Sequence, residues 1–215
     1  MAKSSKKDTE VFSKSEAIKF GFKVAKKNII FFLGVLVIWA FITLISSTIQ
    51  GSLNANRQFF VSFLFNLFMW VVNSIFSMGV VKITLEFVDG KNPKLKDIYY
   101  TKKVFNFILS SLIRGVIVVL GLILFIIPGI IFSIKLQYAD YLIVDKKLDA
   151  VDALKQSWEM TKGHKWNLFL FGILLGLINV LGFLCLLVGL LITVPLSMVV
   201  NAYVYRKLLA QINHK

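Results

Sequence analysis

Long uncharged stretches alternate with short charged segments along the whole chain. Residues 29–49 carry no charged side chain, and at about 1.5 Å per residue a helix of this length crosses a hydrocarbon core of about 30 Å. Residues 166–205 are also uncharged. They would form about 60 Å of helix, which is two crossings. The pattern predicts six transmembrane helices, at about 29–49, 59–85, 104–127, 129–144, 166–188 and 195–209, with Pro128-Gly129 as a tight turn.

Two shorter segments have the periodicity of amphipathic helices, and a third, at 95–103, is a lysine-rich stretch before a span. In the first, Lys19, Lys23, Lys26 and Lys27 share one face, and the opposite face is apolar. Such helices lie in the headgroup layer of a membrane, where lysines attract anionic lipids. Interfacial helices are therefore predicted at about 13–27, 95–103 and 150–162.

The chain also contains an internal similarity. Residues 15–22 resemble residues 151–158, and each segment is followed by a basic turn and a span. Because residues 95–103 hold the same place before the third span, the sequence predicts three repeated units, each an interfacial helix followed by a transmembrane hairpin. The expected fold is an all-α polytopic bundle with one membrane domain at 13–212, preceded by a flexible basic cytoplasmic tail at 1–12.

Composition agrees with a membrane protein. Of 215 residues, 57% are hydrophobic and 17% are charged, against about 25% charged in soluble domains. The net charge of +14 would suggest nucleic acid in a soluble protein. Here the lysines lie beside the apolar runs, so anionic headgroups are the expected partners and nucleic acid is not.

The distribution of basic residues predicts the orientation. Eight lysines precede the first span, and five follow each of the second and fourth spans. The opposite connections carry Arg57 alone. Since basic connections stay in the cytoplasm, we expect a multi-pass protein of the plasma (inner) membrane with both termini cytoplasmic.

Three charged residues fall inside predicted spans, where each is a candidate for a functional site. Arg114 precedes Pro128 by 14 residues and Asp140 follows it by 12, so an antiparallel hairpin places both at a similar depth. We predict that they form a buried ion pair, which either fixes the register of two spans or serves a ligand. Lys135 has no acidic partner at its depth and either extends outward or faces a wet cavity.

The sequence contains no recognisable set of catalytic or metal-binding residues. Two histidines and the single cysteine, Cys185, provide no zinc or thiolate cluster, and no phosphate-binding loop or nucleophile motif is present. No catalytic residue, metal or cofactor is therefore expected. One loop contains three acidic residues, Asp145, Asp149 and Asp152. They suggest either a divalent-ion site or, more simply, a helix N-terminus.

The second half of the chain resembles a known family. The matching elements cover about residues 80–208 and are Pro128-Gly129-Ile130, Tyr138-x-x-Tyr141-x-x-x-Asp145, Ala153-Leu154-Lys155-x-Ser157-Trp158-x-x-Thr161-Lys162-Gly163-x-x-Trp166, Pro195 and Tyr203-x-Tyr205-Arg206. They resemble uncharacterised bacterial membrane proteins that are often labelled as the membrane domain of glycerophosphoryl diester phosphodiesterase. The resemblance implies a six-helix module without the separate soluble domain that performs hydrolysis in that enzyme.

Three functional hypotheses follow. The first is a non-catalytic membrane module or scaffold that interacts with lipids, with another membrane protein or with further copies of itself. The second is a small-solute transporter or permease that uses a polar cavity around Arg114, Lys135 and Asp140. The third is an enzyme of lipid metabolism with a site near Asp145 and His164.

Overall fold

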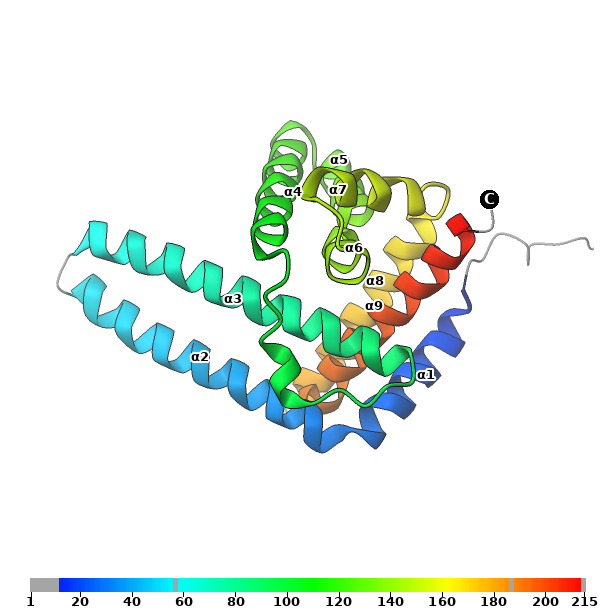
Figure 1. The fold of residues 1–215 in the computed structure, drawn as a ribbon, viewed down its shortest axis with the longest axis horizontal. Helices are drawn as coiled ribbons and strands as arrows, with labels where there is room; N and C mark the ends of the chain where they lie inside the picture. The colour runs from blue at the N-terminus through cyan, green and yellow to red at the C-terminus, as the bar shows by residue number, and fades with distance from the viewer. Residues whose placement is uncertain (1–11, 56–57, 186–187, 214–215) are drawn as a thin grey trace, which may run out of the picture.

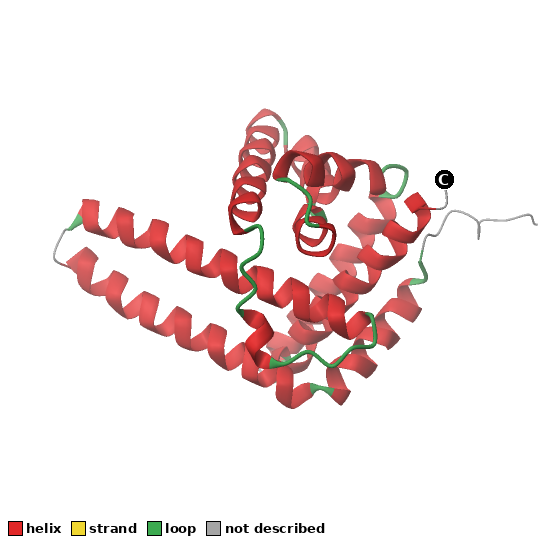
Figure 2. Ribbon diagram, in the orientation of Figure 1, coloured by secondary structure: helices red, strands yellow, loops and turns green. Residues whose placement is uncertain are grey.

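The computed structural model describes residues 12–55, 58–185 and 188–213. Over these residues the chain consists of helices joined by short loops and contains no strand (Figures 1 and 2). The elements are α1 (Lys14–Lys27), α2 (Ile29–Ala55), α3 (Phe59–Val88), the 3-10 turn η1 (Leu95–Ile98), α4 (Val104–Leu124), α5 (Ile126–Leu136), α6 (Ala139–Lys146), α7 (Ala150–Met160), α8 (Lys165–Leu184) and α9 (Leu190–Asn213).

Five segments among the described residues are long and apolar enough to cross a membrane. They are α2, α3, α4, the α5–α6 segment and α8. Helix α9 is long enough, but its polar residues make it less apolar than these five, and it begins five residues before the predicted start at 195. The all-α membrane-type fold is confirmed, whereas the arrangement of six spans is not.

Helix α9 forms the centre of the molecule. It packs against α1, α3 and α8, and Val199, Val200, Ala202, Val204 and Tyr205 are fully buried. A helix enclosed by protein needs less apolar surface than one exposed to lipid, which accounts for the polar positions that α9 tolerates.

The α4–α5 hairpin turns earlier than predicted. The chain reverses at Phe125, which has an extended backbone, three residues before the predicted turn at Pro128-Gly129. Pro128 instead occupies the first turn of α5, where a missing N–H has no helical partner to lose. The two helices touch at Gly121 and Gly129, where no side chain keeps them apart. A Cβ atom added to Gly121 would lie only 2.9 Å from the Cα of Gly129.

Helix α1 packs on protein through its small residues. Ser13 caps the helix by accepting a hydrogen bond from the N–H of Glu16 at 3.4 Å. The buried face consists of Ala17, Gly21 and Ala25, and a Cβ atom on Gly21 would collide with Val200 of α9. The predicted contact of this apolar face with lipid is therefore largely replaced by a helix–helix contact.

The predicted interfacial helix at 95–103 is wrong. Only Leu95–Ile98 forms a short 3-10 turn, and residues 99–103 contain no helix. The backbone of Ile98 lies directly against Gly79 of α3, at a distance that no Cβ atom would permit. This contact holds the segment against α3 in a non-helical conformation. The second unit therefore lacks the amphipathic helix of the other two, and the predicted threefold repeat is not confirmed.

The structure differs from the predicted tail at its last residue, Phe12. Residues 1–11 lie outside the described part of the chain, but Phe12 is buried. Its ring lies edge-on to that of Phe171 in α8, with 5.1 Å between ring centroids. Burial of an aromatic ring ties this residue to the membrane domain.

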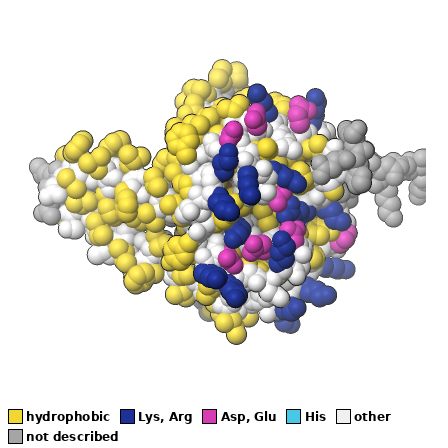
Figure 3. Space-filling model, in the orientation of Figure 1, with side chains coloured by type: hydrophobic (Ala, Val, Ile, Leu, Met, Phe, Trp, Pro, Cys, Tyr) yellow, Lys and Arg dark blue, Asp and Glu magenta, His cyan; other side chains and the backbone are white. Residues whose placement is uncertain are grey.

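The α2–α3 hairpin projects away from the other helices (Figure 1). Its outer part exposes large apolar side chains, among them Phe59 at 81% and Phe60 at 73%. Charged side chains gather instead over the centre and right of the same view (Figure 3). Apolar surface of this extent is expected where hydrocarbon, rather than water, surrounds a protein.

Candidate functional site

The structure brings Arg114 and Asp140 together. Arg114 lies in the middle of α4, and Asp140 lies in the first turn of α6. The Nη1 atom of Arg114 is 2.8 Å from the Oδ2 atom of Asp140, and the two side chains are 26% and 15% exposed. The N-terminus of α6 adds a favourable dipole beside the carboxylate.

Asp140 reaches this position because the predicted span 129–144 is broken into two helices. Helix α5 ends at Leu136 and α6 begins at Ala139. Such a break leaves backbone groups without helical partners, which is tolerated at membrane depth only where protein or a cavity satisfies them. The break therefore needs support from another part of the chain.

Ser157 of α7 supplies that support. Its hydroxyl donates to the carbonyl of Lys135 at 2.8 Å and accepts from the N–H of Tyr138 at 3.2 Å. The hydroxyl of Thr161 lies 3.3 Å from the same carbonyl. The Ser-Trp-x-x-Thr part of the sequence motif thus stabilises the bend that carries Asp140.

Replacing Ser157 with alanine should lower the free energy of unfolding by about 1–3 kcal/mol, because the buried N–H of Tyr138 loses its acceptor. Thermal unfolding in detergent measures this effect. Ser47, on an exposed part of α2, provides the control: its hydroxyl donates to Leu44 of the same helix, and Ser47→Ala should change the midpoint little. Equal effects of the two substitutions would contradict the assigned role of Ser157.

Lys135 points away from the ion pair. Its Nζ atom lies 3.4 Å from the ring centroid of Trp158 in α7, a cation–π contact that supports the ammonium where water is scarce. The sequence hypothesis placed Lys135 in one cavity with Arg114 and Asp140, but the structure does not bring it there.

A polar pocket of about 470 Å³ lies beside the ion pair, between α3, α4 and the α5–α6 segment. Its lining includes Arg114, Asp140 and several small polar side chains, which are Asn73, Ser74, Ser77, Ser111 and Ser133. Within the described residues, the buried Oδ1 atom of Asp140 has no hydrogen-bond partner. The site therefore combines an ion pair with unused hydrogen-bonding capacity.

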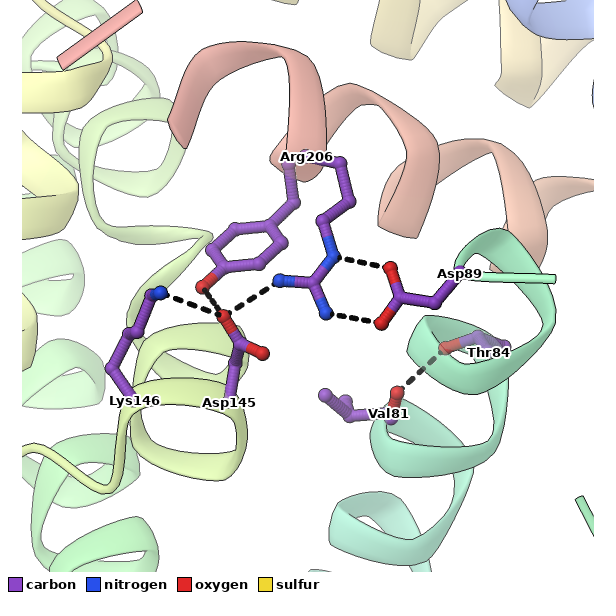
Figure 4. Close-up of polar contacts among 7 residues, drawn as sticks. Val81, Thr84, Asp89, Asp145, Lys146 and Arg206 are labelled. Carbon is purple, nitrogen blue, oxygen red and sulfur yellow. Dashed lines mark hydrogen bonds and ion pairs between the residues drawn. The ribbon is translucent and has the colours of Figure 1, made fainter. Parts of the chain in front are cut away.

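A second charged cluster joins three helices that are far apart in the sequence (Figure 4). Arg206 of α9 donates to both carboxylate oxygens of Asp89, at 2.9 and 2.7 Å, and to Asp145 at 2.7 Å. The hydroxyl of Tyr205 donates to the same Asp145 oxygen at 2.9 Å. This cluster connects the C-terminal ends of α3 and α6 to the second half of α9, so it holds the three hairpins together at one face.

The Arg206 cluster was not predicted from the sequence. Asp89 and Arg206 are 117 positions apart. The available signals were that each charge stands at the end of an apolar run and that Asp145, Tyr205 and Arg206 belong to the matching elements of the resemblance. Asp145 had been considered for a divalent ion or an enzyme site with His164. Its carboxylate is instead engaged by Arg206 and Tyr205.

The other predicted groups lie at the same charged face. Asp149 is the residue before α7, and it accepts from the side chains of Lys103 at 2.8 Å and Asn106 at 2.9 Å. Hydrogen bonding and charge from Lys103 lower the pKa of Asp149. In the described part of the chain, no group of three or more His, Cys, Asp or Glu side chains is placed to hold a metal ion.

The basic face of α1 is accessible. Its four members all have exposed side chains and are Lys19, Lys23, Lys26 and Lys27. Phe22, beside them on the helix, is 47% exposed. Exposed lysines next to an exposed aromatic ring suit the boundary between headgroups and acyl chains.

The sequence matches a known protein family. Residues 23–212 match the family described as Domain of unknown function (DUF7847). The chain belongs to this family. The DUF7847 region contains α2 to α8 completely and includes Arg114, Asp140 and Arg206.

Relatives of this DUF7847 protein occur in mycobacteria. Over 136 residues it is 28% identical to Uncharacterized protein Rv2560 of Mycobacterium tuberculosis and to Uncharacterized protein Mb2590 of Mycobacterium bovis. The match covers 60% of this chain and 40% of each relative, so the chain spans about two fifths of the relatives' length. No solved structure gives a significant match. The comparisons do not link the chain to glycerophosphoryl diester phosphodiesterase, so that resemblance stays a prediction.

Proposed function

We propose that this DUF7847 protein is a non-catalytic, multi-pass module of the cell membrane that binds lipids on its cytoplasmic side. In this proposal the hairpins α2–α3, α4–α5/α6 and α8–α9 cross the bilayer six times, and both termini are cytoplasmic. The observation that carries the proposal is that the charged connections meet at one face, where Arg206 joins Asp89 and Asp145.

Contacts between the basic connections support a common side. Lys82 lies 3.7 Å from Asp97, in the connection after α3, and Lys103 lies 2.8 Å from Asp149, in the connection after α6. The second contact joins the connection after α3 to the connection after α6, so two of the lysine-rich connections touch one another. Because basic connections are retained in the cytoplasm, we assign this face to the cytoplasmic leaflet. Arg57, the basic residue of the opposite side, lies outside the described residues.

The basic face of α1 is proposed to bind anionic headgroups. Each lysine near an anionic surface contributes about 1 kcal/mol of attraction. The small residues on the other side of α1 fix it to α9, so the lysines are held in place at the level of the headgroups. A fixed array of four cations would retain anionic lipid through detergent extraction.

Replacing Lys19, Lys23, Lys26 and Lys27 together with glutamine should reduce the amount of phosphatidylglycerol that stays bound to the purified protein. Native mass spectrometry of the full chain in detergent measures the retained lipid. The matched control is the fourfold replacement with arginine, which keeps the charge and should keep the lipid. Equal retention by the glutamine variant and the wild type would refute the proposed headgroup face.

A second candidate function is transport of a small solute through the pocket beside Arg114 and Asp140. The polar lining of this pocket favours it, while the position of Lys135 over Trp158 removes one of the three side chains expected to form the path. A transporter would have to take up its ligand on one side of the membrane and release it on the other. Ligand uptake into proteoliposomes would separate transport from static binding.

A further inference from the structure

We propose that the pocket beside Arg114 and Asp140 binds the zwitterionic headgroup of a lipid, with an anionic phosphate against Arg114 and an ammonium group against Asp140. The proposal rests on the membrane embedding described above, and it assigns a ligand that the lysine face of α1 does not require. The site lies between α3, α4 and α6, apart from that face.

The first argument is the hydrogen-bonding capacity of the pair. A guanidinium has five N–H donors in a planar fork, and the ion pair involves the Nη1 atom of Arg114. On the acid, Oδ2 faces Arg114, while Oδ1 is covered by protein and lacks a hydrogen-bond partner within the described residues. The side chains of Arg114 and Asp140 are still 26% and 15% exposed, so a ligand that offers an acceptor and a donor can reach both partners from the pocket.

The second argument is charge balance. Arg114 and Asp140 together are neutral, and a lone anion or cation added to them would leave an uncompensated charge in a medium of low dielectric constant. A zwitterion adds two opposite charges and keeps the site neutral. Primary ammonium groups are preferred over quaternary ones because only the former donate N–H hydrogen bonds to a carboxylate.

The third argument is the surface next to the pocket. An apolar groove of about 830 Å³ runs between α2, α3 and α9. Asn73 and Ser77 of α3 line both the groove and the polar pocket, so the two spaces meet at the same helix. A headgroup in one and an acyl chain in the other match the two halves of a lipid, which favours a lipid over a free solute.

Gly115 allows a test that leaves the ion pair intact. It lines the pocket one residue after Arg114, and a Cβ atom added to it would meet no other atom within 4 Å. Gly115→Leu should therefore fold and fill the space where the headgroup is proposed to lie. Gly172 of α8 is equally open and does not line this pocket, which makes Gly172→Leu the matched control.

The experiment is native mass spectrometry of the full chain in detergent with equal amounts of phosphatidylethanolamine, phosphatidylcholine and phosphatidylglycerol. We expect the wild type and Gly172→Leu to bind phosphatidylethanolamine about tenfold more tightly than the other two, and Gly115→Leu to lose this preference, since charge-assisted hydrogen bonds differ by such factors. Soluble phosphoethanolamine forms a separate arm. If it binds at the same site while the lipid does not, the lipid proposal is overturned in favour of a solute.

Two further outcomes would overturn the proposal. One is equal binding of the three lipids by the wild type. The other is an unchanged preference in Gly115→Leu, which would place the lipid elsewhere. Neither result affects the membrane topology or the binding of anionic lipid by α1, so failure of this site is distinguishable from failure of the proposed function.

Discussion

Replacing Arg206 with alanine should lower the free energy of unfolding by about 3 kcal/mol. The change leaves Asp89 and Asp145 without their shared cation, and removing one partner of a largely buried ion pair costs more than the pair contributes. The three side chains are only 15–30% exposed, so water replaces the lost contacts poorly. For a chain of this size the unfolding midpoint in detergent should fall by about 10 °C.

The neighbouring Lys207 provides the control for charge. It is exposed on the same turn of α9, and Lys207→Ala should shift the midpoint by no more than about 2 °C. Arg206→Lys keeps a cation but loses the two-pronged contact with Asp89, so it should fall between the two. If Arg206→Ala and Lys207→Ala unfold together, the cluster does not join the hairpins.

The second large effect is expected at Arg114 and Asp140. Arg114→Leu and Asp140→Leu should each lower the free energy of unfolding by about 3 kcal/mol, because each leaves one unpaired charge inside the membrane domain. The double replacement removes both charges and should be close to the wild type in stability. The expected coupling energy is therefore about 6 kcal/mol, the sum of the two single losses.

Thermal unfolding of the four proteins in one detergent measures this cycle. Additive losses would show that the two side chains do not interact in the folded protein. Lipid selectivity, measured on the same samples, separates stability from binding. The double variant should regain stability without regaining any preference for phosphatidylethanolamine.

The sequence was sufficient for the hairpins and for the approach of Arg114 to Asp140. Long apolar runs predicted the positions of α2, α3 and α4, because only sustained apolar length can satisfy a bilayer. The offsets from Pro128 placed the two charges at a similar depth, since an antiparallel hairpin aligns residues on either side of its turn. The turn itself lies at Phe125, three residues before the predicted position. Arg114 and Asp140 nevertheless lie close enough to form an ion pair.

Other features depend on contacts that no local pattern contains. The break between α5 and α6 is stabilised by Ser157, about twenty positions later in the chain. The segment 95–103 was assigned a helix from its lysines, but its backbone is held by Gly79 of α3. In α1 the periodicity predicted an apolar face at the membrane surface, but Gly21 packs against Val200 of α9, nearly 180 residues away.

Cysteine labelling of intact cells tests the orientation on which the account depends. In a Cys185→Ser background, Gly51→Cys places a probe near the end of α2 and Lys91→Cys places one in the connection after α3; both positions are exposed. With cytoplasmic termini, a membrane-impermeant maleimide added outside should label Gly51→Cys at once and Lys91→Cys only after the membrane is opened. Labelling of Lys91→Cys in intact cells would contradict this orientation.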